Sequence, residues 1–74
     1  MTRPVKRSFS IKGHRTSISL EAEFWTALKG VASEDGQPLA NLIATIDSAR
    51  GTSGLSSAVR VWLLEWYQRA AQKP

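Results

Sequence analysis

The chain has 74 residues, no cysteine and a net charge of +4 at pH 7. This length predicts one domain with a small core that neither disulfides nor cysteine-bound metals reinforce, so we expect it to gain stability by oligomerising. No segment approaches the ~20 apolar residues of a membrane span and no signal peptide begins the chain, so we expect a soluble, cytoplasmic protein without a membrane partner.

The positive charge is concentrated in the first 20 residues. They hold five basic side chains and no acid, whereas residues 21–74 hold five basic and six acidic ones. A basic segment suits a polyanion such as DNA, because phosphate neutralisation releases condensed counterions. It is equally consistent with a solvated tail that keeps the protein soluble. Residues 1–7 are expected to form a basic flexible arm ahead of one domain over residues 8–74.

Two alternating segments flank Gly13. Phe9 and Ile11 occupy odd positions in "KRSFSIK", whereas the less polar side chains of "RTSISL" occupy even positions. A single strand would send these two sets to opposite faces. The change of parity therefore predicts two extended pieces bent at "KGH", a hairpin whose loop uses the backbone freedom of glycine. The second piece has two distinct faces, one with Thr16, Ile18 and Leu20 and the other with Arg15, Ser17 and Ser19.

Two helices are expected next. The first begins with Glu21 and Glu23, whose carboxylates favour the positive end of the helix dipole, and Gly36 is placed to end it. Pro38 suits the first position of the second helix, which Gly51 stops. Their apolar faces are marked by Phe24, Trp25, Leu28, Val31 and Ala32 in the first helix and by Leu39, Leu42, Ile43 and Ile46 in the second.

A third helix follows the flexible "GTSG". Ser56 or Ser57 is placed to cap it, and it runs to about Ala71. Its side chains are apolar around much of its circumference, which usually means burial by more than one neighbour. A second copy of the chain is the natural neighbour, with a monomeric three-helix core as the alternative. The main face comprises Val59, Trp62, Leu63, Trp66 and Ala70, and Val61, Leu64 and Tyr67 widen it.

This order of elements resembles the ribbon-helix-helix family of bacterial DNA-binding proteins. The resemblance lies in "RTSISLEAEFWTALKGVASEDGQPLANLI", and "LIATID" with "LSSAVRVWLLE" is similar to the subgroup with an appended third helix. It implies a mainly α fold with a short N-terminal β-strand. It further implies an intertwined homodimer in which one strand from each subunit forms an antiparallel ribbon. The dimer core would comprise Ile18, Leu20, Phe24, Leu28, Leu42, Ile46, Trp62 and Trp66.

The same resemblance implies where DNA is bound. The outward side chains of the family's ribbon read bases in the major groove, and Arg15, Ser17 and Ser19 occupy those positions here. Arginine can donate two hydrogen bonds to a guanine edge, whereas serine fits several bases. The alternative for the two serines is plain polar surface. Phosphate contacts are expected from Lys6, Arg7, Lys12, His14 and Gln37, although His14 also suits an ordinary turn.

One position departs from the family pattern. Backbone amides at the start of the second helix usually bind a DNA phosphate in this family, and Pro38 removes one such donor. Lys6, Arg7 and Lys12 can compensate as point charges. The serine-rich start of the third helix, with Arg60, is a second candidate anchor.

Catalysis is not expected. His14 is the single histidine, and the sequence holds no cluster of metal ligands and no nucleotide-binding loop. Neither a cofactor nor a metal is therefore expected. The sequence predicts a homodimer that binds double-stranded DNA sequence-specifically, most simply as a bacterial transcriptional repressor. The alternative is a protein-interaction module or antitoxin-like protein of the same dimer fold, with its C-terminal helix as the surface for a protein partner.

Overall fold

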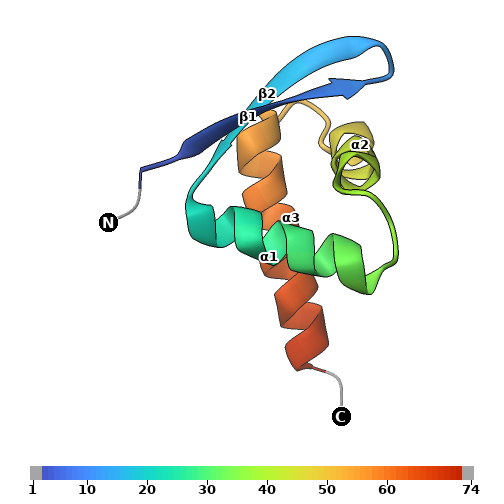
Figure 1. The fold of residues 1–74 in the computed structure, drawn as a ribbon. Helices are drawn as coiled ribbons and strands as arrows, with labels where there is room; N and C mark the ends of the chain where they lie inside the picture. The colour runs from blue at the N-terminus through green and yellow to red at the C-terminus, as the bar shows by residue number, and fades with distance from the viewer. Residues whose placement is uncertain (1–2, 73–74) are drawn as a thin grey trace.

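In the computed structural model, which describes residues 3–72, a β-hairpin lies across one end of three helices (Figure 1). The elements in chain order are β1 (Val5–Ile11), β2 (His14–Leu20), α1 (Ala22–Glu34), α2 (Leu39–Ala49) and α3 (Leu55–Ala71). In Figure 1, α1 crosses α3, and α3 extends from the hairpin toward the opposite end of the molecule. The predicted β element followed by three helices is confirmed.

The hairpin is closed by a two-residue turn. β1 pairs antiparallel with β2, from Val5 opposite Leu20 to Ile11 opposite His14. Both turn residues have positive φ, 53° at Lys12 and 80° at Gly13. A two-residue loop with two positive φ values is a type I′ turn, whose twist matches that of the paired strands. The hairpin predicted from the parity change at Gly13 is therefore confirmed.

One sequence prediction about this segment differs from the structure. β1 begins at Val5, so residues 5–7 of the expected arm belong to the hairpin, while residues 1 and 2 lie outside the described residues. β2 pairs with β1 of the same chain, and the pairing of a strand with a second copy stays a prediction. A short turn keeps β1 and β2 close in sequence, so their pairing costs little loop-closure entropy.

The core lies between the inner face of the hairpin and the three helices. Leu20, Leu28 and Ile43 each have 0% exposure, and burying such a side chain contributes ~1.5–3 kcal/mol. Of the predicted dimer core, five side chains are already buried within one chain and three are partly buried. The five are Ile18, Leu20, Leu28, Leu42 and Ile46, and the three are Phe24, Trp62 and Trp66.

Glycines end the first two helices as predicted. Gly36 has φ 67° and donates from its N–H to the Ser33 carbonyl, while the Gln37 N–H donates to the Ala32 carbonyl, both at 3.0 Å. These paired bonds form a Schellman motif, which satisfies carbonyls left free by the last turn. Gly51, with φ 64°, follows α2. Pro38 is the N-cap of α2, one residue before its predicted place.

The predicted cap of α3 is wrong. Gly54 is the N-cap and makes no side-chain cap hydrogen bond, whereas the Ser56 hydroxyl accepts from the Ser19 N–H at 3.0 Å. The serine thus satisfies a strand amide instead of its own helix. Ala70, predicted to be buried, is exposed. The buried side chains of α3 are Leu55, Val59 and Leu63, and none lies after the middle of the helix.

Candidate nucleic-acid interface

One face of the hairpin is polar along both strands. Cross-strand register places Lys6 opposite Ser19, Ser8 opposite Ser17 and Ser10 opposite Arg15. We call these six side chains the outer face, since they alternate with Phe9, Ile11, Ile18 and Leu20 on the opposite side. Five of the six are exposed and Ser19 is half-buried. The outer face contains two cations, four hydroxyls and no acid, which makes it chemically suited to a polar, anionic partner.

The side chains of the outer face are short between its two cations. The Ser8 and Ser17 hydroxyl oxygens lie 3.3 Å apart, at hydrogen-bonding distance across the ribbon. Lys6 lies near the open end of the hairpin, whereas Arg15 lies near the turn and on the other strand. A surface of this shape allows the backbone to approach a partner closely, with one cation toward each end.

α3 holds the last part of β2. The Ser19 N–H donates to the Ser56 hydroxyl, and the Ser19 carbonyl accepts from the Arg60 guanidinium at 3.1 Å. In a two-residue hairpin, backbone groups of alternate residues point away from the partner strand. Ser19 is such a residue, so α3 occupies part of the edge of β2 that a further strand would need.

Arg60 has a structural role that the sequence did not reveal. Its Nη2 lies 3.0 Å from Glu21 Oε1, and its guanidinium lies over the Phe24 ring, 5.7 Å from the centroid. The prediction of Arg60 as a phosphate anchor is not supported by this geometry, because the guanidinium already has a carboxylate partner. No local pattern signals a contact between residues 39 apart in sequence.

The Glu21 carboxyl is affected by the same contact. A backbone hydrogen bond and then the hydrogen bond from Arg60 lower its pKa below the ordinary value. Both donors favour the charged carboxylate. Glu21 is also the N-cap residue of α1, and it makes no side-chain cap hydrogen bond there. Its carboxylate therefore links the start of α1 to α3.

Trp25 fixes the start of β1. Its Nε1 donates to the Val5 carbonyl at 2.9 Å, and its ring stacks on Phe9 with centroids 5.9 Å apart. The Arg7 guanidinium lies over the same ring, 5.4 Å from the centroid. Arg7 thus belongs to the inner side of the hairpin, where it covers Trp25, and it does not share the outer face with Lys6.

The remaining predicted phosphate ligands lie at two places. Lys12 in the turn donates to the Ser48 hydroxyl of α2 at 3.2 Å. It lines a hollow together with His14, Arg15, Arg50 and the acidic Asp47. Gln37 lies in the turn between α1 and α2, where its Nε2 donates to the Asp35 carboxylate at 3.3 Å. The structure therefore brings Lys12, His14 and Arg15 together and leaves Gln37 beside an acid.

Comparison with known families agrees with this architecture. A family model described as "Ribbon-helix-helix domain" matches residues 4–67, which include both strands and most of α3. The chain belongs to the ribbon-helix-helix family. Domains of this family generally bind DNA as transcription regulators. Comparisons with curated proteins and with solved structures found no match.

Two features are absent from the described part of this ribbon-helix-helix chain. Within residues 3–72, no three His, Asp or Glu side chains are grouped so that they could hold a metal ion. Across the same residues, no helix has both the length and the apolar character needed to cross a membrane.

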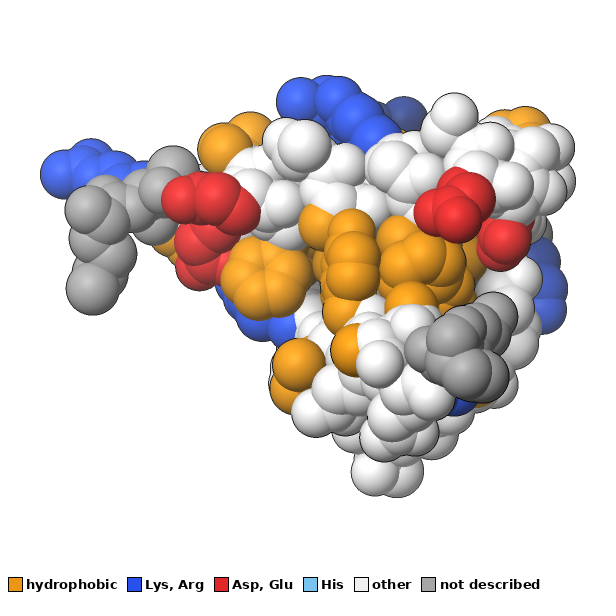
Figure 2. Space-filling view, turned by 90° about the horizontal axis from the view of Figure 1, so that it is seen from below, with side chains coloured by type: hydrophobic (Ala, Val, Ile, Leu, Met, Phe, Trp, Pro, Cys, Tyr) orange, Lys and Arg blue, Asp and Glu red, His pale blue; other side chains and the backbone are white. Residues whose placement is uncertain are grey.

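A second surface of this ribbon-helix-helix chain is apolar. Val61, Leu64 and Tyr67 on α3 are 52%, 57% and 47% exposed, and we call them the α3 stripe. A groove on one side of the stripe is lined by Phe24 and Ala27 of α1. Seen from the C-terminal end of α3, hydrophobic side chains gather between acidic ones (Figure 2).

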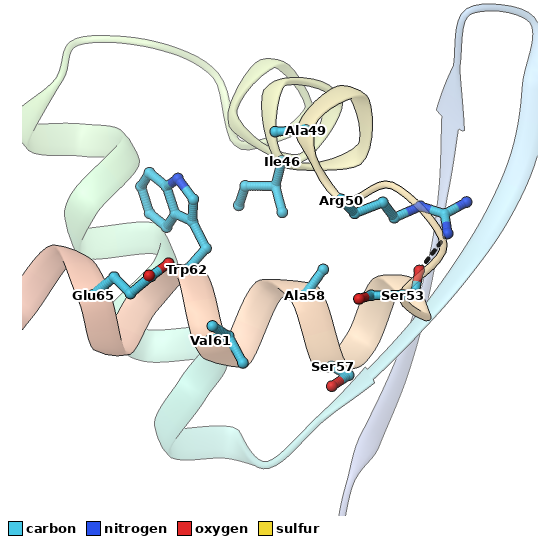
Figure 3. Close-up of a pocket in the computed structure, with 9 residues that line it drawn as sticks. All are labelled: Ile46, Ala49, Arg50, Ser53, Ser57, Ala58, Val61, Trp62 and Glu65. Atoms are coloured by element: carbon cyan, nitrogen blue, oxygen red, sulfur yellow. Dashed lines mark hydrogen bonds between the residues drawn. The ribbon is translucent and has the colours of Figure 1, made fainter.

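A second hollow borders the stripe on the side of α2. In Figure 3, Trp62 of α3 and Ile46 of α2 face each other across it, and Val61 and Glu65 lie along α3. Arg50, at the end of α2, pairs with Asp47 at 2.7 Å and contacts the Ser53 carbonyl. Val61 thus borders both hollows, whereas Leu64 and Tyr67 line only the groove beside α1.

Proposed function

We propose that this protein is a homodimer that binds double-stranded DNA sequence-specifically and represses transcription in bacteria. The outer face of the hairpin enters the major groove. The observation that carries the proposal is the composition of that face, which combines two cations and four hydroxyls with no acid, in a chain of a DNA-binding family. A two-stranded ribbon fits the major groove in width, and β-ribbons are an established class of groove reader.

Base contacts come from β2. Arg15 donates two hydrogen bonds to a guanine edge, and Ser17 and Ser19 donate or accept at neighbouring base edges. Base contacts by Arg15 and Ser17 have the strongest support, because both side chains are exposed. Ser19 is half-buried, and its backbone N–H donates to Ser56 of α3.

Phosphate contacts come mainly from the hairpin. Lys6 lies on the outer face, and Lys12 and His14 lie at or beside the turn, within reach of the backbones that border the groove. Arg7 and Gln37 remain in the proposal with weaker support, because their side chains lie against Trp25 and Asp35. Phosphate contacts of this kind position a protein on DNA without reading its sequence.

The α3 stripe supports homodimerisation. A two-fold interface brings the same patch of both copies together, so the patch must complement itself. The stripe and the groove that it lines are both apolar, so the stripes of two copies can pack against each other. Such an association removes the exposed Val61, Leu64 and Tyr67 from water, which is favourable at ~25 cal/mol per Å² buried.

The same stripe supports a second candidate function. An exposed apolar patch is also suited to another protein, as in an interaction module or an antitoxin-like protein. The two candidates differ in the mass that the purified protein should have in solution. A homodimer covers the stripe without any other component, whereas an interaction module leaves it open until its partner binds.

Selection of duplexes from a random pool by the purified protein tests the proposal. The recovered site should be an approximate inverted repeat, because two copies related by a two-fold axis bind it. Arg15→Ala should weaken binding by ~1–3 kcal/mol for each bidentate pair of hydrogen bonds that it removes, and should relax base preference at two symmetric positions. Arg15→Lys keeps the charge but removes the rigid fork. If no duplex is enriched by the parent protein, the proposed function is wrong.

A further inference from the structure

The edge of β2 that faces away from β1 is closed by α3 at one end only. Because the turn between the strands has two residues, the backbone N–H and C=O of Arg15, Ser17 and Ser19 point toward this edge. The Ser19 N–H donates to the Ser56 hydroxyl at 3.0 Å, and the Ser19 C=O accepts from Arg60 at 3.1 Å. Within residues 3–72, α3 thus engages the edge groups of Ser19 and leaves those of Arg15 and Ser17 open.

The α3 stripe lies next to this edge. Arg60, which donates to the Ser19 carbonyl, also lines the groove beside Val61, Leu64 and Tyr67. The exposed apolar side chains of the stripe therefore adjoin the point where α3 closes the edge of β2. A second copy that covers the stripe is thereby brought beside the open part of the edge. This continuity makes a second copy of β2 the occupant that the edge fits.

Two-fold symmetry leaves few registers for such a pair. Two copies of β2 pair antiparallel, and their hydrogen-bonded pairs join residues whose backbone groups point toward the shared edge. With Ser17 on the axis, Arg15 would need the partner's Ser19, whose groups are already bonded to α3. With Arg15 on the axis, Ser17 would face the partner's Gly13, which lies in the turn at φ 80°. Each of these registers retains only the pair on the axis.

A third register uses the open groups alone. With Thr16 on the axis, Arg15 of each copy faces the partner's Ser17, and each of these two pairs exchanges both hydrogen bonds. α3 keeps its contacts with Ser19, and the ion pair between Arg60 and Glu21 is preserved. This register therefore forms more backbone hydrogen bonds than either alternative and breaks none within the chain.

We propose that Ser56 and Arg60 are positioning residues that set the register of a ribbon between two copies of β2. By closing the edge at Ser19, they place Arg15 opposite the partner's Ser17. This inference rests on the proposed DNA-binding homodimer and adds the register of its ribbon. The two β2 strands then lie in the major groove with Arg15 and Ser17 next to the two-fold axis, and each β1 flanks them on the outside. The bases that Arg15 reads accordingly lie near the centre of the bound site.

Single cysteines report the register, because the chain has none of its own. In the proposed register, the two copies of Thr16 form a non-hydrogen-bonded pair with Cα atoms ~4.5 Å apart, within the range that a disulfide spans. Thr16→Cys should therefore oxidise to a covalent dimer on a non-reducing gel. The two copies of Ser17 are diagonal neighbours at about 7–8 Å, beyond that range, so Ser17→Cys should stay monomeric on the gel.

Other patterns of crosslinking contradict the register. A covalent dimer of Ser17→Cys without one of Thr16→Cys would place Ser17 on the axis. Dimers of both variants would mean that α3 fixes no single register, and dimers of neither would mean that β2 does not pair with a second copy. Circular dichroism should show that both cysteine variants are folded.

A double variant tests the role of α3. Ser56→Ala with Arg60→Met removes the hydroxyl and the guanidinium that bond to the edge of β2, so the register with Ser17 on the axis becomes available. In this background Ser17→Cys should gain a covalent dimer, a change that a merely structural role would not produce. Ser57→Ala with Arg69→Met makes the same changes at exposed positions of α3 and should leave Ser17→Cys monomeric on the gel. An unchanged pattern in the folded double variant would overturn the positioning role.

These outcomes are separate from those of the proposed function. If the parent selects an inverted repeat but Thr16→Cys forms no covalent dimer, the register is overturned while the proposed function stands. If the parent selects no duplex, the proposed function fails, and the two cysteine variants still decide the register.

Discussion

Arg60 of α3 donates to the Glu21 carboxylate at the start of α1, with Nη2 and Oε1 3.0 Å apart. The same guanidinium donates to the Ser19 carbonyl at the end of β2. One side chain therefore ties together a strand, the helix that follows it and a helix much later in the sequence. The contact decides how the hairpin is held on the helices.

This contact predicts a loss of stability in acid. The pKa of Glu21 is lowered in the folded chain, so the unfolded chain binds the proton more readily. The resulting stabilisation is complete above the ordinary carboxyl pKa and is lost as pH falls through the lowered value. Glu21→Gln should thus show a smaller decrease in unfolding midpoint than the parent between about pH 7 and about pH 3. Glu34→Gln, at the exposed end of α1, is the control, and parallel curves for parent and Glu21→Gln would contradict the prediction.

Neighbouring positions on β2 should respond oppositely to an introduced carboxylate. Ile18 has 0% exposure, and an unpaired buried charge costs several kcal/mol. A core of this size supplies only ~3–5 kcal/mol of net stability, so Ile18→Asp should leave the chain unfolded by circular dichroism. Ser17→Asp, one residue earlier on the outer face, should fold normally and bind DNA more weakly. A folded Ile18→Asp chain would mean that the inner face is not part of the core.

Trp25 should stabilise the start of β1. Trp25→Phe keeps an aromatic ring against Phe9 but removes the N–H that donates to the Val5 carbonyl. Removal of this hydrogen bond should cost ~1–2 kcal/mol and speed amide exchange in β1, as measured by NMR in deuterated buffer. Trp62→Phe, on α3, should leave exchange in β1 unchanged.

Salt dependence should identify the phosphate contacts. Each phosphate neutralised on duplex DNA contributes ~0.9 to the slope of log K against log salt. Lys6→Gln should therefore lower the magnitude of the slope by about two, because the homodimer carries two copies of Lys6. Lys29→Gln removes an exposed charge from α1 and should leave the slope unchanged. An equal slope for parent and Lys6→Gln would remove Lys6 from the interface.

The α3 stripe should control the oligomeric state. Sedimentation at micromolar concentration should give the parent a mass near twice 8.1 kDa. Leu64→Glu places a charge on the stripe, at a side chain that is 57% exposed in one chain, so it should yield a folded monomer. Ala70→Glu places the same charge at an exposed position on another side of α3 and should remain a dimer. A parent that sediments as a monomer would favour the interaction-module candidate.

Local structure followed from the sequence because its causes are local. The change of parity at Gly13 predicted the hairpin, since φ preferences and side-chain alternation act over neighbouring residues. Gly36 and Gly51 similarly predicted the ends of α1 and α2. Alternation alone placed Arg15 and Ser17 on the outward face, opposite the buried Ile18.

The tertiary structure decided which groups form hydrogen bonds with the Ser19 backbone at the edge of β2. Nothing near Ser56 or Arg60 in the sequence indicates Ser19 or Glu21 as a partner, because these contacts join residues 37 to 41 apart. The helical period of α3 predicted its apolar positions, but only the packing of α1 and α2 determined that Leu63 is covered and Leu64 is exposed.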